Sequence, residues 1–250
     1  MAELTVITNN MSESKYLIDF HTHILPGMDD GAKDVEESLW LLRQEALQGV
    51  DEVFLTPHFY ASQNSPMEFL KRRNQSWKNL SACLEPGLPA LRLGAEVQYF
   101  DGICSVEEIR HLRIVGTNLL LLEMPFSRWT DRIISNVIEL NGLWGLQVVL
   151  AHIERYMPMQ TDAVWERLRA YGVWMQSNIS FFENWRTKRK AASLLTRGQI
   201  QFMGSDCHDR TVRCPKWDRV PNQVKNVLMT NSVSMMMQGL NTDGVHLEYV

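Results

Sequence analysis

Seven short apolar runs, separated by segments of helical pattern, constrain the fold of this chain more than any other feature. Runs rich in Val, Ile and Leu that alternate with helices are typical of parallel strands joined by right-handed crossovers. The runs lie at 16–18, 53–56, 91–95, 119–122, 148–151, 173–176 and 200–205. The pattern predicts an α/β protein with seven βα units arranged as a barrel.

Helical patterns fill the intervals between these runs. The segment 34–48 begins with Asp34, which is suited to cap a helix, carries Glu37 three residues later and has apolar residues at helical spacing. Similar patterns predict helices at 67–84, 131–140, 162–171 and 186–197.

The size and composition of the chain fit one such domain. Its 250 residues match the ~250 residues of a typical barrel, and its 45% hydrophobic content can fill the core. We expect residues 1–15 to form a loose N-terminal arm and residues 16–250 to form a single barrel domain.

Other compositional features bear on location and partners. The chain shows neither a signal-peptide pattern nor an apolar run near the ~18 residues of a membrane span, and its four cysteines are scattered. We therefore expect a cytoplasmic protein without membrane insertion or a disulfide framework. The net charge of -4 argues weakly against a nucleic-acid partner.

Most of the apolar runs end in side chains that can bind a metal ion. His21 and His23 follow the first run two residues apart, so strand geometry points both to one face, and Asp29 and Asp30 add carboxylates. Later runs end at His58, Glu96, Glu123, His152, Asp206 and His208. The carboxyl ends of barrel strands meet at one end of the barrel, where active sites lie. The sequence therefore predicts a hydrolytic site that holds several divalent ions.

Six motifs, in this order, resemble the polymerase and histidinol phosphatase (PHP) superfamily. They are D-F-H-T-H-I-L-P-G-M-D-D-G-A (19–32), T-P-H (56–58), G-A-E (94–96), L-L-E-M (121–124), A-H-I-E-R-Y (151–156) and G-S-D-C-H (204–208). The first and fifth look like those of bacterial protein-tyrosine phosphatases that accompany tyrosine kinases in capsule and exopolysaccharide export. The resemblance implies a distorted TIM-like (β/α)7 barrel.

The resemblance also implies three divalent metal ions, usually manganese, with iron or zinc as alternatives. Its implied ligands for the first ion are His21, His23, Glu96 and Asp206. Those for the second ion are Asp30, His58 and His208. Those for the third are Glu123 and His152, with Glu96 as a bridge. The same resemblance marks Arg155 and Arg213 as phosphate-binding residues, whereas the loop at 178–190 departs from the family pattern.

These residue types imply a mechanism. Divalent ions lower the pKa of a bound water from about 15.7 toward ~7, and the resulting hydroxide would attack phosphorus. Arg155 and Arg213 would neutralise the non-bridging oxygens. A tyrosine phenol, with a pKa near ~10, leaves more readily than an alkoxide. Asp206, Asp209 or a histidine could protonate it, and the sequence does not choose among them.

Aromatic residues after the strand ends suggest the substrate. Phe126 and Phe181, with Phe59, Tyr60 and Phe182, would form an apolar rim that favours a phenyl ring over the charged head of histidinol phosphate. We expect a phosphatase of phosphotyrosine proteins, acting by resemblance on a bacterial tyrosine autokinase of capsular or exopolysaccharide biosynthesis. A small-molecule phosphatase of the histidinol phosphate type, or another PHP phosphoesterase, is the alternative.

A cysteine-dependent mechanism is the chemical rival. Cys207 and Arg213 have the spacing of the nucleophile and arginine of thiol-dependent tyrosine phosphatases. The intervening residues contain no glycine to wrap a phosphate, and Asp206 and Asp209 would raise the thiol pKa. We therefore expect Cys207 to fill space between two metal ligands.

Overall fold

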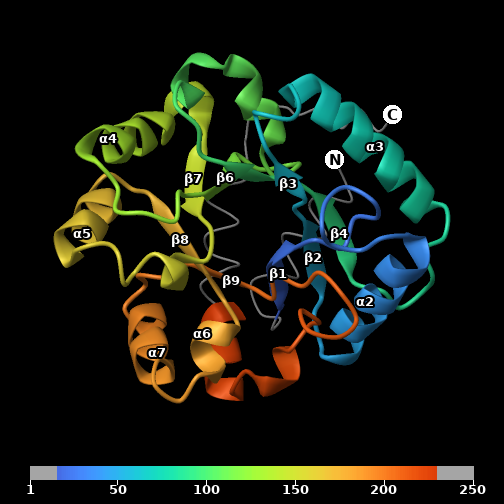
Figure 1. Cartoon of the computed structure of the whole chain (residues 1–250). Helices are drawn as coiled ribbons and strands as arrows, with labels where there is room; N and C mark the ends of the chain where they lie inside the picture. The colour runs from blue at the N-terminus through green and yellow to red at the C-terminus, as the bar shows by residue number, and fades with distance from the viewer. Residues whose placement is uncertain (1–15, 230–250) are drawn as a thin grey trace, which may run out of the picture.

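The computed structural model describes residues 16–229 (Figure 1). All pairings between its strands are parallel. The strands are β1 (Ile18–Thr22), β2 (Glu52–Leu55), β3 (His58–Phe59), β4 (Ala90–Leu93), β5 (Glu96–Gln98), β6 (Leu119–Glu123), β7 (Gln147–Leu150), β8 (Trp174–Asn178) and β9 (Phe202–Gly204). The predicted arm at 1–15 and the last part of the predicted domain, 230–250, lie outside the described residues.

The strands form a distorted barrel, as predicted. Two of the seven expected strands are interrupted, one into β2 and β3 and the other into β4 and β5. β2 pairs with β4 and β3 pairs with β5, so with each interrupted strand counted once the neighbours follow in chain order from β1 to β9. The ring closes where the amide of Asp206 donates to the carbonyl of His21 at 2.8 Å and the amide of His23 donates to the carbonyl of Cys207 at 2.9 Å. Closure brings the ends of the first and last strands side by side, and with them the candidate ligands at and after these ends.

Helices surround the strands (Figure 1). They are α2 (Val35–Leu47), α3 (Pro66–Ser81), α4 (Asp131–Leu140), α5 (Asp162–Ala170), α6 (Ser180–Glu183) and α7 (Lys188–Thr196). Asp34 caps α2 as predicted, because its side chain accepts a hydrogen bond from the amide of Glu37 at 2.9 Å. The short helix α6, which follows β8, is absent from the sequence prediction.

Short 3-10 helices of one or two turns supply several of the remaining connections. They are η1 (Ile103–Ser105), η2 (Glu107–Leu112), η3 (Leu143–Gly145), η4 (Ile153–Arg155) and η5 (Trp217–Arg219). Among residues 16–229, no helix is long and apolar enough to cross a membrane.

Aromatic and aliphatic side chains fill the interior of the barrel. The Phe20 ring stacks on that of Phe202 with 4.0 Å between centroids, and the Phe54 ring lies 5.0 Å from Phe20. Leu119, Leu121, Val149 and other apolar residues complete this cluster. The candidate ligands lie beyond this apolar cluster, at the carboxyl ends of the strands.

Candidate metal centre

A register shift in β1 directs the first two histidines toward the barrel axis. Ile18 and Phe20 belong to the interior apolar cluster, so simple alternation would point His21 outward. The β1–β2 pairing shifts between Asp19 and Thr22, as a bulge does when it re-aims a side chain. The Nε2 atoms of His21 and His23 consequently lie 3.1 Å apart. The predicted convergence of the two imidazoles is confirmed, although a register shift and not simple alternation turns them toward the axis.

Four donor atoms form a first cluster around this pair. Glu96 Oε2 lies 3.1 Å from His21 Nε2 and 3.3 Å from His23 Nε2. Asp206 Oδ1 lies 3.8 Å and 3.5 Å from the same two nitrogens. Ligands placed ~2.1 Å from a common ion are separated by about 3.0–3.4 Å in octahedral or tetrahedral geometry. The cluster therefore has dimensions close to those of a metal site.

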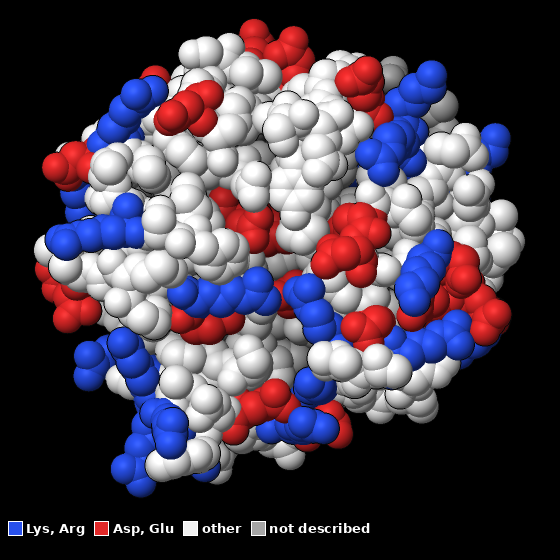
Figure 2. Space-filling model, in the orientation of Figure 1, with Lys and Arg blue, Asp and Glu red and all other residues white. Residues whose placement is uncertain are grey.

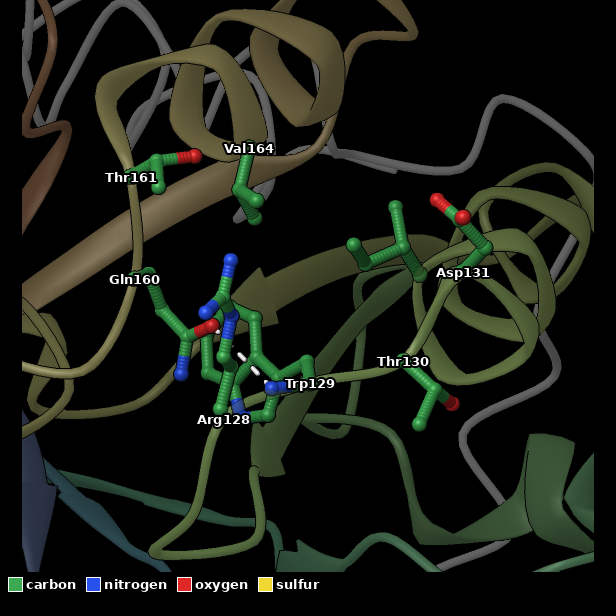
Figure 3. A pocket seen from close by; sticks show the side chains of 8 residues that line it. Arg128, Trp129, Thr130, Asp131, Gln160, Thr161 and Val164 are labelled. Carbon is green, nitrogen blue, oxygen red and sulfur yellow. Dashed lines mark hydrogen bonds between the residues drawn. The ribbon is translucent and has the colours of Figure 1, made fainter.

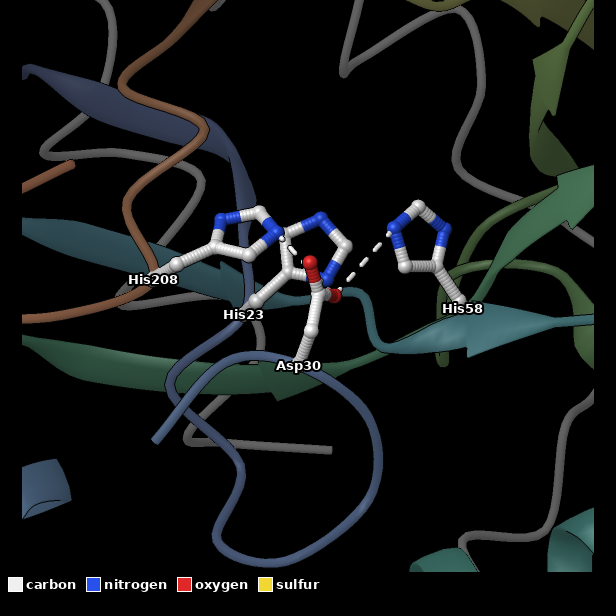
Figure 4. Close-up of side chains that lie close together, drawn as sticks. All are labelled: His23, Asp30, His58 and His208. Atoms are coloured by element: carbon white, nitrogen blue, oxygen red, sulfur yellow. Dashed lines mark ion pairs between the residues drawn. The ribbon is translucent and has the colours of Figure 1, made fainter. Parts of the chain in front are cut away.

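A second cluster lies beside the first (Figure 4). Asp30 Oδ1 is 3.4 Å from His208 Nε2 and 3.7 Å from His58 Nε2. His23, Asp30, His58 and His208 each offer one donor atom within 4.8 Å of the others. His23 thus lies at the boundary between the two clusters.

Glu96 connects the first two clusters of donor atoms to a third cluster. Its Oε1 lies 2.8 Å from His152 Nε2, whereas its Oε2 faces His21, His23 and His58. Glu123 Oε1 is 3.6 Å from the same His152 nitrogen. Donor atoms of His58, Glu96 and Glu123 also fit within 4.8 Å, so His58 reaches both the second and the third cluster.

Several buried donor atoms of the site have no hydrogen-bond partner among the described residues. These atoms are Glu96 Oε2, His58 Nδ1, His152 Nδ1 and His208 Nε2. Glu96 Oε2 is 3.0 Å from His58 Nδ1 without hydrogen-bond geometry. Buried polar atoms are normally paired, and an unpaired group calls for an explanation such as an ion. The His, Asp and Glu clusters therefore fit metal binding.

The electrostatics of Glu96 suit a metal ligand. Burial alone would raise the pKa of its carboxyl, but the imidazoles of His21, His152 and His23 hold that pKa well below its usual range. Glu96 is therefore ionised at neutral pH, the form in which a carboxylate binds a metal.

Two of the candidate ligands have unusual backbone conformations. His152 has a φ of 31° and Asp206 a φ of 54°, in the left-handed region that residues other than glycine seldom adopt. Such strain persists where the surrounding structure fixes it, and it concentrates at functional sites. At these positions the chain turns out of β7 and β9 and swings the side chains over the barrel mouth.

Three residues that hold the candidate ligands in place were not assigned this role from the sequence. Asp29 Oδ2 pairs with His23 Nδ1 at 2.8 Å and accepts the amide of His58 at 2.8 Å. Asp29 thus orients the imidazole of His23. Of the carboxylates of Asp29 and Asp30, only that of Asp30 faces the clusters of donor atoms. A carboxylate on the far nitrogen of a metal-binding histidine fixes its tautomer and raises its basicity.

Two amides on β8 complete this support. Gln176 Oε1 accepts the amide of His152 at 2.7 Å and lies 3.4 Å from His21 Nδ1. Gln176 Nε2 donates to Asn178 Oδ1 at 3.1 Å, and Asn178 Nδ2 donates to Asp206 Oδ2 at 2.7 Å. In the sequence, Gln176 and Asn178 lie two residues apart at the end of a strand that supplies no ionisable candidate ligand. This spacing was the only sign of their supporting role.

Two arginines lie over the clusters. Arg155 Nη2 makes a close ion pair with Asp206 Oδ2, and Arg213 Nη2 lies 2.8 Å from Asp206 Oδ1. Arg213 Nη1 is also 3.8 Å from Asp30 Oδ2. Figure 2 shows basic and acidic side chains side by side around the centre of this face. The arrangement offers guanidinium donors to an anion that enters the mouth.

Neither aspartate considered as a proton donor is suited to that role in this geometry. Burial would raise the pKa of Asp206, but His21 and His23 hold it well below its usual range. Burial also acts to raise the pKa of Asp209, yet hydrogen bonds from Thr211 and the amide of Val212 lower it to about 2. Both carboxyls are therefore ionised at neutral pH.

The thiol alternative finds no support in the geometry. Cys207 is fully buried, and its Sγ lies 3.7 Å from Glu45 Oε1. Burial, with the nearby carboxylates of Glu45 and Asp19, raises the pKa of the thiol well above its ordinary value. A buried, protonated thiol is a poor nucleophile.

Only part of the predicted aromatic rim is open to solvent. Phe126 is 57% exposed and stacks on His152 with 6.0 Å between ring centroids. Tyr60 stacks on His58 at 5.1 Å. These two rings border the clusters on the side of β3 and β6.

The prediction that Phe181 contributes to the rim needs correction. Phe181 and its neighbour Phe182 are 5% and 4% exposed and belong to the hydrophobic core, as does Phe59. The unpredicted helix α6 turns both rings inward, where burial of apolar area stabilises the fold by about 25 cal/mol per Å². Phe181 therefore packs beneath the surface and cannot flank a substrate.

Comparison with known proteins places the chain in a family. The chain is 29% identical over 216 residues to the tyrosine-protein phosphatase CpsB of Streptococcus agalactiae, covering 80% of this chain and 86% of that protein. It is 26% identical over 209 residues to the tyrosine-protein phosphatase YwqE of Bacillus subtilis, covering 79% of each.

A solved structure shows the same fold. It is described as YwqE from Bacillus subtilis and CpsB from Streptococcus pneumoniae, unique metal-dependent tyrosine phosphatases, and matches with a TM-score of 0.69 at 21% identity. The match covers 89% of this chain and 92% of that one. Residues 17–242 match the family model described as capsular polysaccharide synthesis, CpsB/CapC. The chain therefore belongs to the CpsB/CapC family.

Proposed function

We propose that this protein is a metal-dependent phosphatase of phosphotyrosine proteins. The observation that carries the proposal is the position of Glu96, whose two oxygens face different groups of ligand atoms, while two arginines contact the neighbouring candidate ligand Asp206. A carboxylate with this placement suits a bridge between metal ions. The curated relatives named as tyrosine-protein phosphatases support the same activity.

The nine ligand positions would hold three ions, with manganese as the expected metal. His21, His23 and Asp206 would bind one ion together with Glu96. Asp30, His58 and His208 would bind the second. Glu123 and His152 would bind the third, on the Oε1 side of Glu96. Such ions supply hydroxide at neutral pH and offset negative charge on a phosphoryl group.

Arg155 and Arg213 would bind the phosphate of the substrate. Both guanidiniums contact Asp206, so they converge on one point at the rim of the clusters. A planar guanidinium can donate two parallel hydrogen bonds to a phosphoryl group, and this bidentate geometry favours one orientation of the phosphorus. The two arginines would therefore align the phosphorus above the clusters.

The leaving group would be a phenolate. Asp206 and Asp209 are ionised, so neither can supply a proton at neutral pH. A phenol has a pKa near ~10 and departs with little assistance, whereas a serine alkoxide does not. The exposed Phe126 ring, stacked on His152, would contact the phenyl ring of the substrate.

The protein substrate would be a tyrosine autokinase of capsular or exopolysaccharide biosynthesis, in a cytoplasmic setting. This part of the proposal is supported by the family, which is described by capsular polysaccharide synthesis. The ligand clusters and arginines recognise a phosphate and not the protein that carries it.

Catalytic efficiency on phosphotyrosyl peptide, phosphoseryl peptide and histidinol phosphate tests the proposal. We expect the phosphotyrosyl peptide to be the best substrate, and Phe126→Ala to reduce that preference about three- to tenfold, the effect of one aromatic contact. The buried Phe181→Leu serves as a control that should leave the preference unchanged. Highest efficiency on histidinol phosphate would contradict the proposal.

A further inference from the structure

A pocket lies between the loops that lead into α4 and α5 (Figure 3). Its volume is about 500 Å³, within the ~300–1,000 Å³ typical of small-ligand sites. Ile134 and Val164 supply apolar walls, and Trp129 and Gln160 line it as well. Both loops follow the carboxyl ends of strands, so the pocket lies at the same end of the barrel as the candidate ligands.

The walls of the pocket are fixed by hydrogen bonds. The amide of Trp129 donates to Gln160 Oε1 at 3.1 Å, and Gln160 Nε2 donates to the carbonyl of Ser127 at 2.8 Å. The indole Nε1 of Trp129 donates to the carbonyl of Pro125 at 2.9 Å. The two hydrogen bonds of Gln160 join the loops, and the indole bond fixes Trp129 within its own loop. The cavity is therefore preformed.

Arg128 is the distinctive residue of this pocket. Its side chain lies beside Gln160 and Trp129, and its guanidinium points toward Val164 (Figure 3). No carboxylate within residues 16–229 pairs with it. The carboxylate of Asp131, which also lines the pocket, already pairs with Arg167 Nη1 at 3.1 Å. The pocket therefore presents a positive charge beside apolar walls.

Ring contacts connect the pocket to the metal centre. Trp129 lies 5.3 Å from Tyr156, and Tyr156 lies 5.4 Å from His152, between ring centroids. Phe126, which stacks on His152, is only two residues before Arg128. The two steps place the Trp129 ring within about 11 Å of the His152 ring, and an extended peptide, at about 3.3–3.6 Å per residue, covers that distance in about three residues.

We propose that this pocket binds an anionic side chain of the substrate, two to four residues from the phosphotyrosine held at the metal centre. The anion would be a carboxylate or a second phosphoryl group, because a guanidinium binds either through charge-assisted hydrogen bonds. The apolar walls accept the aliphatic or aromatic stem of the same residue. This inference rests on the proposed phosphatase function and assigns the enzyme a preference for acidic or multiply phosphorylated segments.

Peptides with one phosphotyrosine test the inference. Each carries alanine, glutamate or a second phosphotyrosine at one position, two to four residues to either side. Affinity is measured by calorimetry with phosphonomethyl-phenylalanine in place of the central phosphotyrosine, and kcat/KM is measured with the phosphorylated peptides. We expect an anion at one of these positions to improve both quantities about tenfold over alanine, the effect of one charge-assisted hydrogen bond.

Three variants test whether Arg128 and the pocket cause the preference for anionic peptides. Arg128→Ala should bring the ratio between anionic and alanine peptides close to one, Arg128→Lys should keep part of it, and Val164→Trp should abolish it by filling the pocket. Arg132→Ala is the matched control, because Arg132 is exposed on α4 and pairs with Asp101.

A ratio near one in the unmodified enzyme would overturn the inference, and so would a preference that survives Arg128→Ala. Equal loss in Arg132→Ala would also overturn it, since general surface charge would then be responsible. A binding preference without any turnover would instead contradict the phosphatase function and leave the pocket assignment standing.

Discussion

Glu96 contacts more candidate ligands than one carboxylate oxygen could reach. It is 1% exposed, and its two oxygens lie within 3.3 Å of nitrogens from four histidines. An ionised carboxylate buried among imidazoles is costly unless charge or an ion compensates it. The position follows from β5, a strand of three residues that begins at Glu96 itself.

Two residues of the A-H-I-E-R-Y motif should have separable roles. His152→Ala should lower both metal content and phosphatase rate, because the site loses a donor atom that lies 2.8 Å from Glu96. Arg155→Ala should retain the metal and lower kcat/KM about 10²-fold through weaker binding of phosphoryl oxygens. Metal analysis and vanadate inhibition distinguish the two. If both variants lose metal equally, Arg155 is structural.

Strand β8 supports the site although it supplies no proposed metal ligand. Its amides Gln176 and Asn178 hold the backbone of His152 and the carboxylate of Asp206. Asn178→Ala should reduce metal affinity or activity about 10–100-fold, the usual cost of losing such a supporting contact. The control is Gln201→Ala, since Gln201 is a buried amide that bonds the amide of Met175 on the same strand. Metal titration of both variants checks the prediction, and equal losses would contradict it.

Much of the strand order and ligand placement could be predicted because both depend on local pattern. Each apolar run became a strand or an interrupted strand, and α4 has the predicted bounds. The register shift that turns His21 inward could not be predicted, because alternation alone gives the opposite face. The inward turn of Phe181 depends on α6, whose four residues carry too little periodicity to be recognised.

A buried carboxylate makes the stability of the whole molecule depend on pH. Glu45 of α2 is fully buried, and burial together with nearby Asp19 raises its pKa well above the usual value. The folded state therefore favours the protonated form. The resulting stability is fully present below the unfolded pKa of about 4.3 and is lost as pH rises through the higher folded value.

Glu45→Gln should consequently reduce the loss of stability between pH 5 and pH 8.5. The amide stays neutral over this range, so its burial carries no growing cost. Urea unfolding of chelator-treated protein at several pH values measures the free energy of unfolding, with Glu139→Gln, an exposed position on α4, as the control. An unchanged pH slope in Glu45→Gln would show that this carboxyl does not govern the dependence.

The proposed chemistry belongs to a metal cluster and not to a thiol. Its most direct test is to measure metal content and phosphotyrosyl phosphatase activity on the same preparation, before and after chelation, for the unmodified enzyme and for Cys207→Ser. We predict about three ions per chain, loss of activity on chelation, recovery with manganese and near-normal turnover by Cys207→Ser. Activity that resists chelation but disappears in Cys207→Ser would contradict the account.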